Sequence, residues 1–184
     1  MGAQSMMIII IVVVVIMMIL GWYISVSNKL NRALVKIDEA NSGIDVALTK
    51  RYDVLTKMMD VVKAYTKHEK EMLFEIVKLR SNMTMEEKNE ANTKMDHNFE
   101  QIRILAENYP DLRSSENYRT LQQAISDVEE HLQAARRMYN SNVSILNQAL
   151  VTFPTSIVAN SRGITKRSFF EAEEKKKEDV KIDL

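Results

Sequence analysis

The chain has 184 residues, no Cys, and 25 basic against 25 acidic side chains, so its formal net charge is zero. A neutral chain lacks the basic surplus that attracts nucleic acid, and a chain without Cys forms no disulfide, thiolate zinc site or iron–sulfur cluster. With only four Gly and two Pro, the composition predicts an all-α protein built from long helices.

The first predicted element is an uncharged apolar stretch, MMIIIIVVVVIMMILGWYISV, from Met6 to Val26. At 1.5 Å per residue it extends ~31 Å, which matches the hydrocarbon core of a bilayer. A cleaved signal peptide would carry a basic region before the stretch and a small-residue site after it, and neither is present. Residues 1–27 are therefore predicted to be a single-pass transmembrane anchor. The predicted anchor residues include Met6, Leu20, Trp22 and Tyr23, the last two at the interface where aromatic side chains are enriched.

Three basic residues, Lys29, Arg32 and Lys36, follow the apolar stretch closely. Basic residues concentrate on the cytoplasmic side of membrane spans. The sequence therefore favours a cytoplasmic location for the rest of the chain.

A long amphipathic helix is predicted over residues 28–80. Fifteen positions, stepped alternately four and three residues apart from Leu30 to Leu79, include twelve apolar side chains. A 3.5-residue period held over this length is typical of a helix that packs along its whole length with coiled-coil geometry. The three polar interruptions are Asn41, Arg51 and Glu69.

Two further long helices are predicted. The sequence TMEE, from Thr84 to Glu87, has the spacing of a capping box, so a helix is expected over residues 85–108, closed by Pro110. A third helix is expected over residues 115–150. Together with the first, these helices predict an antiparallel bundle with coiled-coil-like packing.

The bundle is predicted to occupy residues 28–163, with Pro154 ending the third long helix and Gly163 ending one more short helical stretch. Residues 164–184 form a short C-terminal segment with a charged tail. Within it, Phe169 and Phe170 stand beside basic residues and could touch a membrane surface or dock on the bundle; docking is preferred.

The expected helix lengths leave one apolar surface without an obvious partner. At 1.5 Å per residue the three helices measure ~80, ~36 and ~54 Å, so an up, down and up arrangement covers mainly the distal part of the first helix. The apolar seam from Leu30 to Leu48 then requires a cover. Either the C-terminal segment folds back over it, or a second copy of the chain does, since exposed apolar stripes usually mark contacts.

The polar motif AYTKHE contains His68 and Glu69, which raises the question of a metal site. A helical zinc motif needs a second His four residues after the first, and that position is Met72. Glu69 lies on the apolar seam, where a structural ion pair is favoured over a functional carboxylate.

A second group of polar residues stands on the third helix in AARRMYN. These candidate partner-contact or structural polar residues are Arg136, Arg137, Tyr139 and Asn140. An Arg side chain can hold a carboxylate within a bundle or capture one from a partner, and pairing between helices is the default. No Gly-rich phosphate loop and no nucleophile with a paired base is present, so no catalytic, cofactor or metal site is predicted.

Several motifs resemble the LemA family of bacterial membrane-anchored helical proteins. They are VKIDEANSGIDVALTKRYDVLTKMMDVVKAYTKHE, AENYPDL, SENYRTLQQAISDVEEHLQAARRMYN, and FP followed by FFE. The resemblance runs in order from Leu34 to Phe170. It implies an N-terminal anchor in the bacterial cytoplasmic membrane, a bundle of long helices, and no catalytic function. It also implies a role in organising membrane proteins, with a membrane metalloprotease as a possible partner through frequent genetic neighbourhood.

Three functional hypotheses follow. The preferred one is a non-enzymatic membrane scaffold or adaptor that contacts the lipid bilayer and other membrane proteins. The alternative is a homo-oligomer that shapes the membrane, supported by the uncovered seam from Leu30 to Leu48. An enzyme using His68, Glu69 and the Arg pair is the least favoured.

Overall fold

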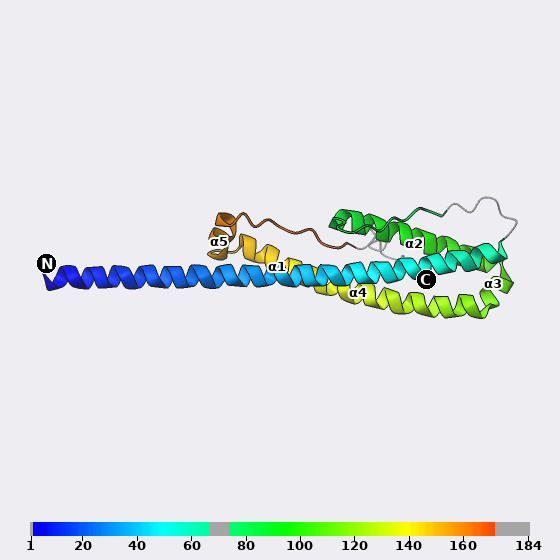
Figure 1. The fold of residues 1–184 in the computed structure, drawn as a ribbon, viewed down its shortest axis with the longest axis horizontal. Coiled ribbons are helices and arrows are strands. Elements are labelled where there is room, and N and C mark those ends of the chain that lie inside the picture. Colours follow the sequence, from blue (N-terminus) through cyan, green and yellow to red (C-terminus); the bar gives the residue numbers. More distant parts are fainter. Residues whose placement is uncertain (1, 67–73, 172–184) are drawn as a thin grey trace, which may run out of the picture. The chain divides into compact units, whose positions relative to one another are not determined.

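The computed structural model describes residues 2–66 and 74–171, and in these ranges the chain forms helices without strands (Figure 1). The predicted all-α class and the N-terminal apolar helix followed by packed helices are confirmed. The elements in chain order are α1 (Ala3–Tyr65), α2 (Met85–Asn108), α3 (Pro110–Ser114), α4 (Glu116–Val151) and α5 (Thr155–Ser161).

The described residues divide into two compact units that are interleaved in sequence. The first unit contains residues up to 39 together with residues 141–167, and the second contains residues from 40 to 140 together with those from 168. Both α1 and α4 therefore contribute residues to each unit.

Helix α1 is continuous over 63 residues, but it ends at Tyr65 and not near residue 80 as the periodicity predicts. Residues 74–80 are not helical, and Ile76, a predicted seam position, is 76% exposed. The side chain of Asn98 pairs with both the N–H and the C=O of Glu75, at 2.8 and 2.9 Å. These two bonds satisfy the backbone N–H and C=O of Glu75 without a helix. The apolar period of the sequence therefore did not determine the structure of this segment.

The start of α2 is the predicted capping box. The Glu87 N–H donates to the Thr84 hydroxyl at 3.2 Å, and the Thr84 N–H donates to the Glu87 carboxylate at 2.8 Å. Pro110 follows the end of α2 and is also the first residue of the short helix α3. Its missing N–H costs nothing there, because the first N–H groups of a helix have no acceptor within the helix.

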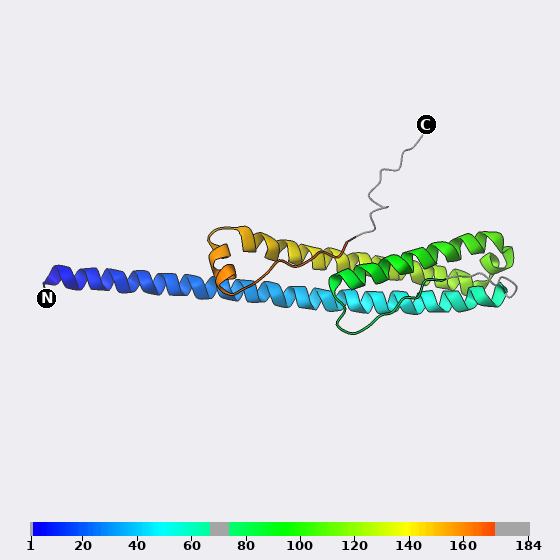
Figure 2. The same cartoon turned by 90° about the horizontal axis from the view of Figure 1, so that it is seen from above.

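In the second unit α2 runs parallel to α1, which differs from the expected up, down and up arrangement. Lys88 near the start of α2 bonds Asn41 at 2.8 Å, and Arg51 further along α1 bonds Asn92 at 2.8 Å. Residue numbers therefore rise together along the two helices. Residues 74–84 lead the chain back toward the start of α2, because Glu75 lies beside Asn98 in the middle of that helix and Thr84 caps its first turn. Figures 1 and 2 show this return beside α1 and α2.

Helix α4 runs antiparallel to α1 in the second unit, as predicted. Arg51 bonds Glu129, and Gly43, earlier in α1, faces Ala135, later in α4. A Cβ at Gly43 would lie 4.0 Å from that of Ala135, which is ordinary contact.

The first unit supplies a cover for the N-terminal part of the apolar seam. Leu30 and Ile37 are 1% and 2% exposed, and the same unit contains the end of α4, helix α5 and the chain up to residue 167. Gly163, with φ of +64°, ends α5 as predicted. The cover is therefore supplied within the same chain, mainly by the end of α4 and by α5, which precede the C-terminal segment considered as a cover, and not by a second copy.

Candidate functional site: a buried arginine and its cleft

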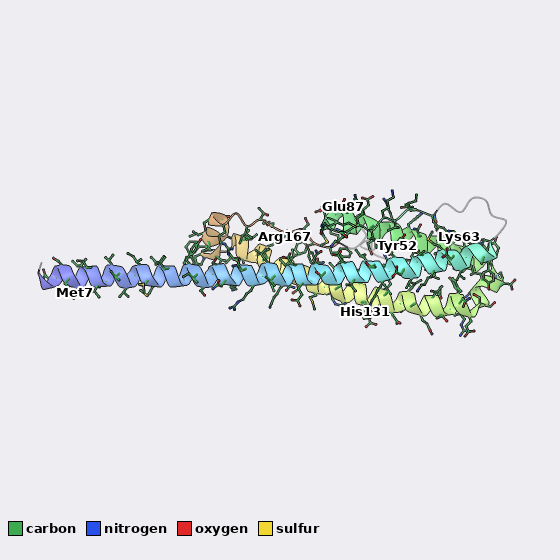
Figure 3. All side chains as sticks on the ribbon, viewed as in Figure 1. Met7, Tyr52, Lys63, Glu87, His131 and Arg167 are labelled. Carbon is green, nitrogen blue, oxygen red and sulfur yellow. The ribbon has the colours of Figure 1, made fainter. Side chains whose placement is uncertain are left out.

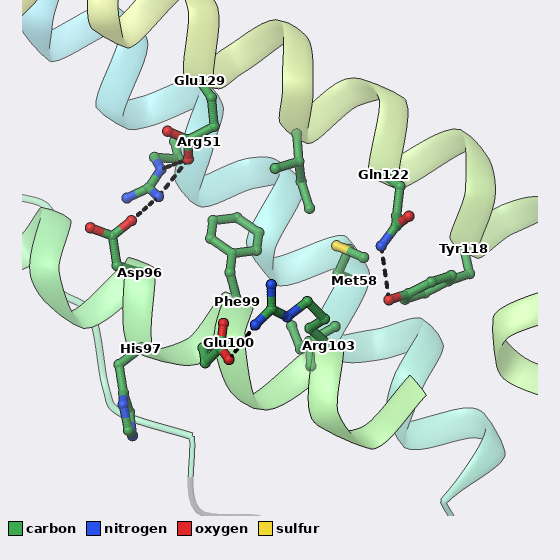
Figure 4. A pocket seen from close by; sticks show the side chains of 12 residues that line it. Arg51, Met58, Asp96, His97, Phe99, Glu100, Arg103, Tyr118, Gln122 and Glu129 are labelled. Atoms are coloured by element: carbon green, nitrogen blue, oxygen red, sulfur yellow. Dashed lines mark hydrogen bonds and ion pairs between the residues drawn. The ribbon is translucent and has the colours of Figure 1, made fainter. Parts of the chain in front are cut away.

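Arg51 is, with Lys88, one of the two most enclosed charged side chains among the described residues of the second unit, with a side-chain exposure of 3%. The 3.5-residue period of α1 places it on the apolar face, between Leu48 and Leu55, which are both buried. Figure 4 shows its guanidinium between α2 and α4, facing Asp96 and Glu129.

Every guanidinium nitrogen of Arg51 donates to a neighbouring helix. Nε donates to Glu129 at 2.7 Å, one Nη donates to the side-chain and backbone oxygens of Asn92 at 2.8 and 3.1 Å, and the other Nη pairs with Asp96. The guanidinium carbon also lies 5.1 Å from the centre of the Phe99 ring, within cation–π range. One side chain thus joins α1, α2 and α4.

A cleft of about 480 Å³ opens beside this arginine. Its lining residues are Arg51, Met58, Asp96, His97, Phe99, Glu100, Ile102, Arg103, Tyr118, Gln122, Ile125 and Glu129. Burial raises the pKa of Tyr118, whose hydroxyl accepts a bond from Gln122 at 3.0 Å. Tyr118 is therefore a neutral hydrogen-bonding group at physiological pH.

The cleft offers little for binding or catalysis, because its charged side chains already pair with one another. The Arg51 guanidinium is occupied by the bundle, and Arg103 pairs with Glu100 at 2.7 Å. An open site for phosphate or carboxylate would need donors aimed at the cavity. In the described ranges, no three His, Asp or Glu side chains converge as metal ligands. The arrangement is that of an interhelical polar clamp.

Two predicted polar residues, Tyr139 and Asn140, hold the C-terminal chain against the second unit. The Tyr139 hydroxyl donates to the Ser168 carbonyl at 3.0 Å. The Asn140 side chain pairs with both backbone groups of Phe170 at 2.9 Å. Phe170 is 2% exposed, so its predicted docking is confirmed, while Phe169 is 42% exposed.

The same amide arrangement recurs at three other asparagines. Asn98 holds Glu75 in the second unit, as described above, and Asn147 holds both backbone groups of Arg167 at 3.0 Å in the first unit. Asn89 of α2 bonds the Phe169 carbonyl and the Glu171 N–H at 3.5 and 3.2 Å. A primary amide offers one donor and one acceptor side by side, so it can pair with an extended backbone as a neighbouring strand would.

Of the remaining predicted polar site residues, the structure describes Arg136 and Arg137. Arg136 is half-buried and Arg137 is exposed, and neither forms a hydrogen bond or ion pair within residues 2–66 and 74–171. His68 and Glu69 lie outside the described residues. The predicted grouping of these residues as partner-contact or structural groups stays a prediction.

The predicted anchor residues lie on the exposed part of α1. Met6, Leu20, Trp22 and Tyr23 are 62%, 52%, 36% and 40% exposed. Figure 3 shows the side chains around Met7 extending outward from the helix. By length and composition, α1 is the one helix in the described part of the chain that could cross a membrane.

Sequence analysis identified Arg51 only as an interruption of the apolar period, and it missed Asp96, Glu129 and Lys88. Lys88 is 2% exposed and pairs with Asp45 at 2.5 Å. A partial signal was available, since a basic residue on the apolar face of a helix requires an acidic partner. The partners' identities depend on the parallel register of α2, which the sequence pattern does not specify.

Comparison with known proteins supports one family. A model of the LemA family matches residues 40–184. Protein LemA of Metamycoplasma hominis is 31% identical over 163 residues, covering 86% of this chain and 74% of that protein. The chain therefore belongs to the LemA family.

Proposed function

We propose that this protein is a non-enzymatic, single-pass membrane scaffold of the bacterial cytoplasmic membrane that organises other membrane proteins. The observation that carries the proposal is the exposure of the apolar part of α1. Large apolar side chains from Met6 to Ile24 are 36–67% exposed. In water such a surface is strongly unfavourable, whereas a bilayer would bury it.

The bundle supports a binding role better than a catalytic role. The charged groups most enclosed among the described residues of the second unit, Arg51 and Lys88, are fully engaged in joining helices. Catalysis requires a nucleophile, base or electrophile aimed at an open cavity. A rigid set of helices held by such clamps would instead present constant surfaces to partners, with the membrane metalloproteases as a partner class to test.

The membrane-shaping alternative loses its original support. It depended on an uncovered seam from Leu30 to Leu48, and Leu30, Ile37, Ile44 and Leu48 are all nearly inaccessible within the single chain. A homo-oligomer would have to use other surfaces.

The test is photocrosslinking in cells from probes at exposed positions, Lys36 in the first unit and Arg137 in the second, read by mass spectrometry. We expect capture of a discrete membrane protein at Arg137. The matched control carries the same Arg137 probe in a chain lacking residues 1–27, which should lose that capture because it no longer reaches the membrane. Capture of neither another protein nor a second copy would refute the scaffold.

A further inference from the structure

The end of α4 and the start of α5 carry an unusual group of exposed apolar side chains. Val151, Phe153 and Ile157 are 65%, 77% and 55% exposed. The four residues from 151 to 154 are all exposed, although three of them are apolar or Pro. Single exposed apolar residues are common, but a cluster in one turn marks a contact surface.

Hydrogen bonds from the end of α5, the helix that follows this turn, hold that helix beside the end of the apolar part of α1, within the first unit. The Tyr23 and Ser161 hydroxyls lie 3.5 Å apart. Arg162 donates to the Ser27 carbonyl at 3.0 Å and to Asn31 at 2.7 Å. Both cartoon views show α5 against α1 at this level (Figures 1 and 2).

The depth of the turn follows from the register of α1. Tyr23 precedes Val26, the last residue of the apolar stretch, by three residues, or ~4.5 Å along the helix. With the apolar stretch filling the hydrocarbon core, α5 lies at the boundary between the core and the headgroups. Apolar side chains at this level reach the acyl region, as those of interfacial helices do.

The net charge of the first unit is also consistent with contact between this turn and a membrane. Its basic residues are Lys29, Arg32, Lys36, Arg162, Lys166 and Arg167, and its acidic residues are Asp38 and Glu39. The unit therefore carries 6 − 2 = +4 in a chain whose total is zero. Anionic headgroups attract such a surplus beside a membrane span.

We infer that the α4–α5 turn is a second membrane contact, in which Val151, Phe153 and Ile157 enter the interfacial layer of the leaflet where α1 ends. The inference rests on the proposed membrane anchor and adds a specific lipid-binding surface to it. The occupant is lipid and not protein because α5 lies against Tyr23, which belongs to the exposed apolar span, and because the unit carries a surplus of positive charge. The contact fixes the first unit to the bilayer at two points.

The absence of Cys allows a direct test, because each engineered Cys is the only labelling site. Full-length Val151→Cys and Phe153→Cys are labelled with an environment-sensitive fluorophore and reconstituted into phosphatidylcholine–phosphatidylglycerol vesicles. Quenching by lipids spin-labelled near the headgroup reports contact with the interface. Val35→Cys is the matched control, since Val35 is also a valine with 65% exposure in the first unit, nine residues and ~14 Å beyond Val26. Met18→Cys reports the span itself.

We expect shorter emission wavelengths and strong shallow-lipid quenching at positions 151 and 153, and neither at 35. Adding Phe153→Asp to Val151→Cys should reduce the quenching while circular dichroism stays unchanged. If the Met18 label enters the bilayer but the labels at 151 and 153 behave like that at 35, the second contact is refuted and the anchor stands. If the Met18 label also remains in water, the anchor and the second contact are both refuted.

Discussion

At the scale of single residues, Arg51 shows how a charge can occupy a position that the apolar period reserves for a hydrophobic side chain. Its guanidinium is enclosed, yet Asp96, Glu129 and Asn92 accept all of its donors. A buried ion pair adds little net stability relative to an apolar replacement of all partners, but removal of one partner leaves charge uncompensated.

We expect Arg51→Met to lower the free energy of unfolding by about 3–5 kcal/mol, because Asp96 and Glu129 would remain close together without their cation. The matched control is Arg103→Met, which breaks an exposed pair with Glu100 and should cost about 0–1 kcal/mol. Thermal unfolding of the full chain in mild detergent, followed by circular dichroism, measures both. Equal effects would mean that the enclosed arginine is not a clamp.

A second residue-scale prediction concerns the amide that holds the extended chain after α1. Asn98 is fully buried and pairs with both backbone groups of Glu75. Asn98→Ala should destabilise the fold by about 2–4 kcal/mol, since two backbone groups lose their partners at roughly 1–3 kcal/mol each and water recovers part of the loss. Hydrogen exchange at the Glu75 amide should accelerate. Asn142→Ala, which removes one exposed bond to Lys36, is the comparison and should leave that amide unchanged.

The hydrogen-bond and ion-pair partners of a residue could be predicted from the sequence only where they lie close to it along the chain. The capping box of Thr84 and Glu87 spans only four residues, and its spacing predicts it. Arg51 was visible as an anomaly, but Asp96 and Glu129 stand 45 and 78 residues away. Their roles depend on helix register, which arises from packing of the whole bundle.

At the scale of elements, the unexpected feature is that extended chain accompanies the helices. The apolar period continues to Leu79, so periodicity alone favours one long helix. The bonds from the buried amide of Asn98 to the backbone of Glu75 favour extended chain instead. Helices with caps and Pro boundaries were therefore predictable, while the direction of α2 was not, because it depends on the connecting segment.

The first turn of α2 gives a pH-dependent prediction. A backbone N–H in this turn and the Ser168 hydroxyl lower the pKa of Glu86 below its ordinary value of 4.5. A lowered pKa in the folded state contributes stability above the ordinary value, and this contribution is lost as the pH falls through the folded-state pKa. Glu86→Gln should therefore reduce the melting temperature at about pH 7 and have a smaller effect at about pH 3.

The comparison for this prediction is Glu130→Gln, an exposed glutamate in the middle of α4. Its effect on the melting temperature should be small at both pH values, since no helix N-terminus adjoins it. If Glu86→Gln lowers the melting temperature equally at both pH values, the charge of Glu86 is not the cause of the effect.

At the scale of the whole molecule, location depends on the apolar part of α1. Ile16 stands near the centre of the stretch, and an Arg there should cost about 2.5–3.5 kcal/mol of insertion free energy. Ile16→Arg is expected to reduce the fraction of protein that resists alkaline extraction from membranes. Asn28→Arg, just after the stretch, should leave that fraction unchanged, because a charge there reaches the headgroups.

The interleaving of the two units has a consequence for synthesis. Leu30 and Ile37 are made early, but residues 141–167, which complete their unit, follow more than a hundred residues later. At ~5–20 residues per second, ~7–26 s pass between Ile37 and residue 167 leaving the ribosome. Until residues 141–167 have been made, Leu30 and Ile37 lack the part of the chain that completes their unit. A chaperone or a partner protein can therefore bind these apolar side chains in the nascent chain until residues 141–167 of the same chain cover them.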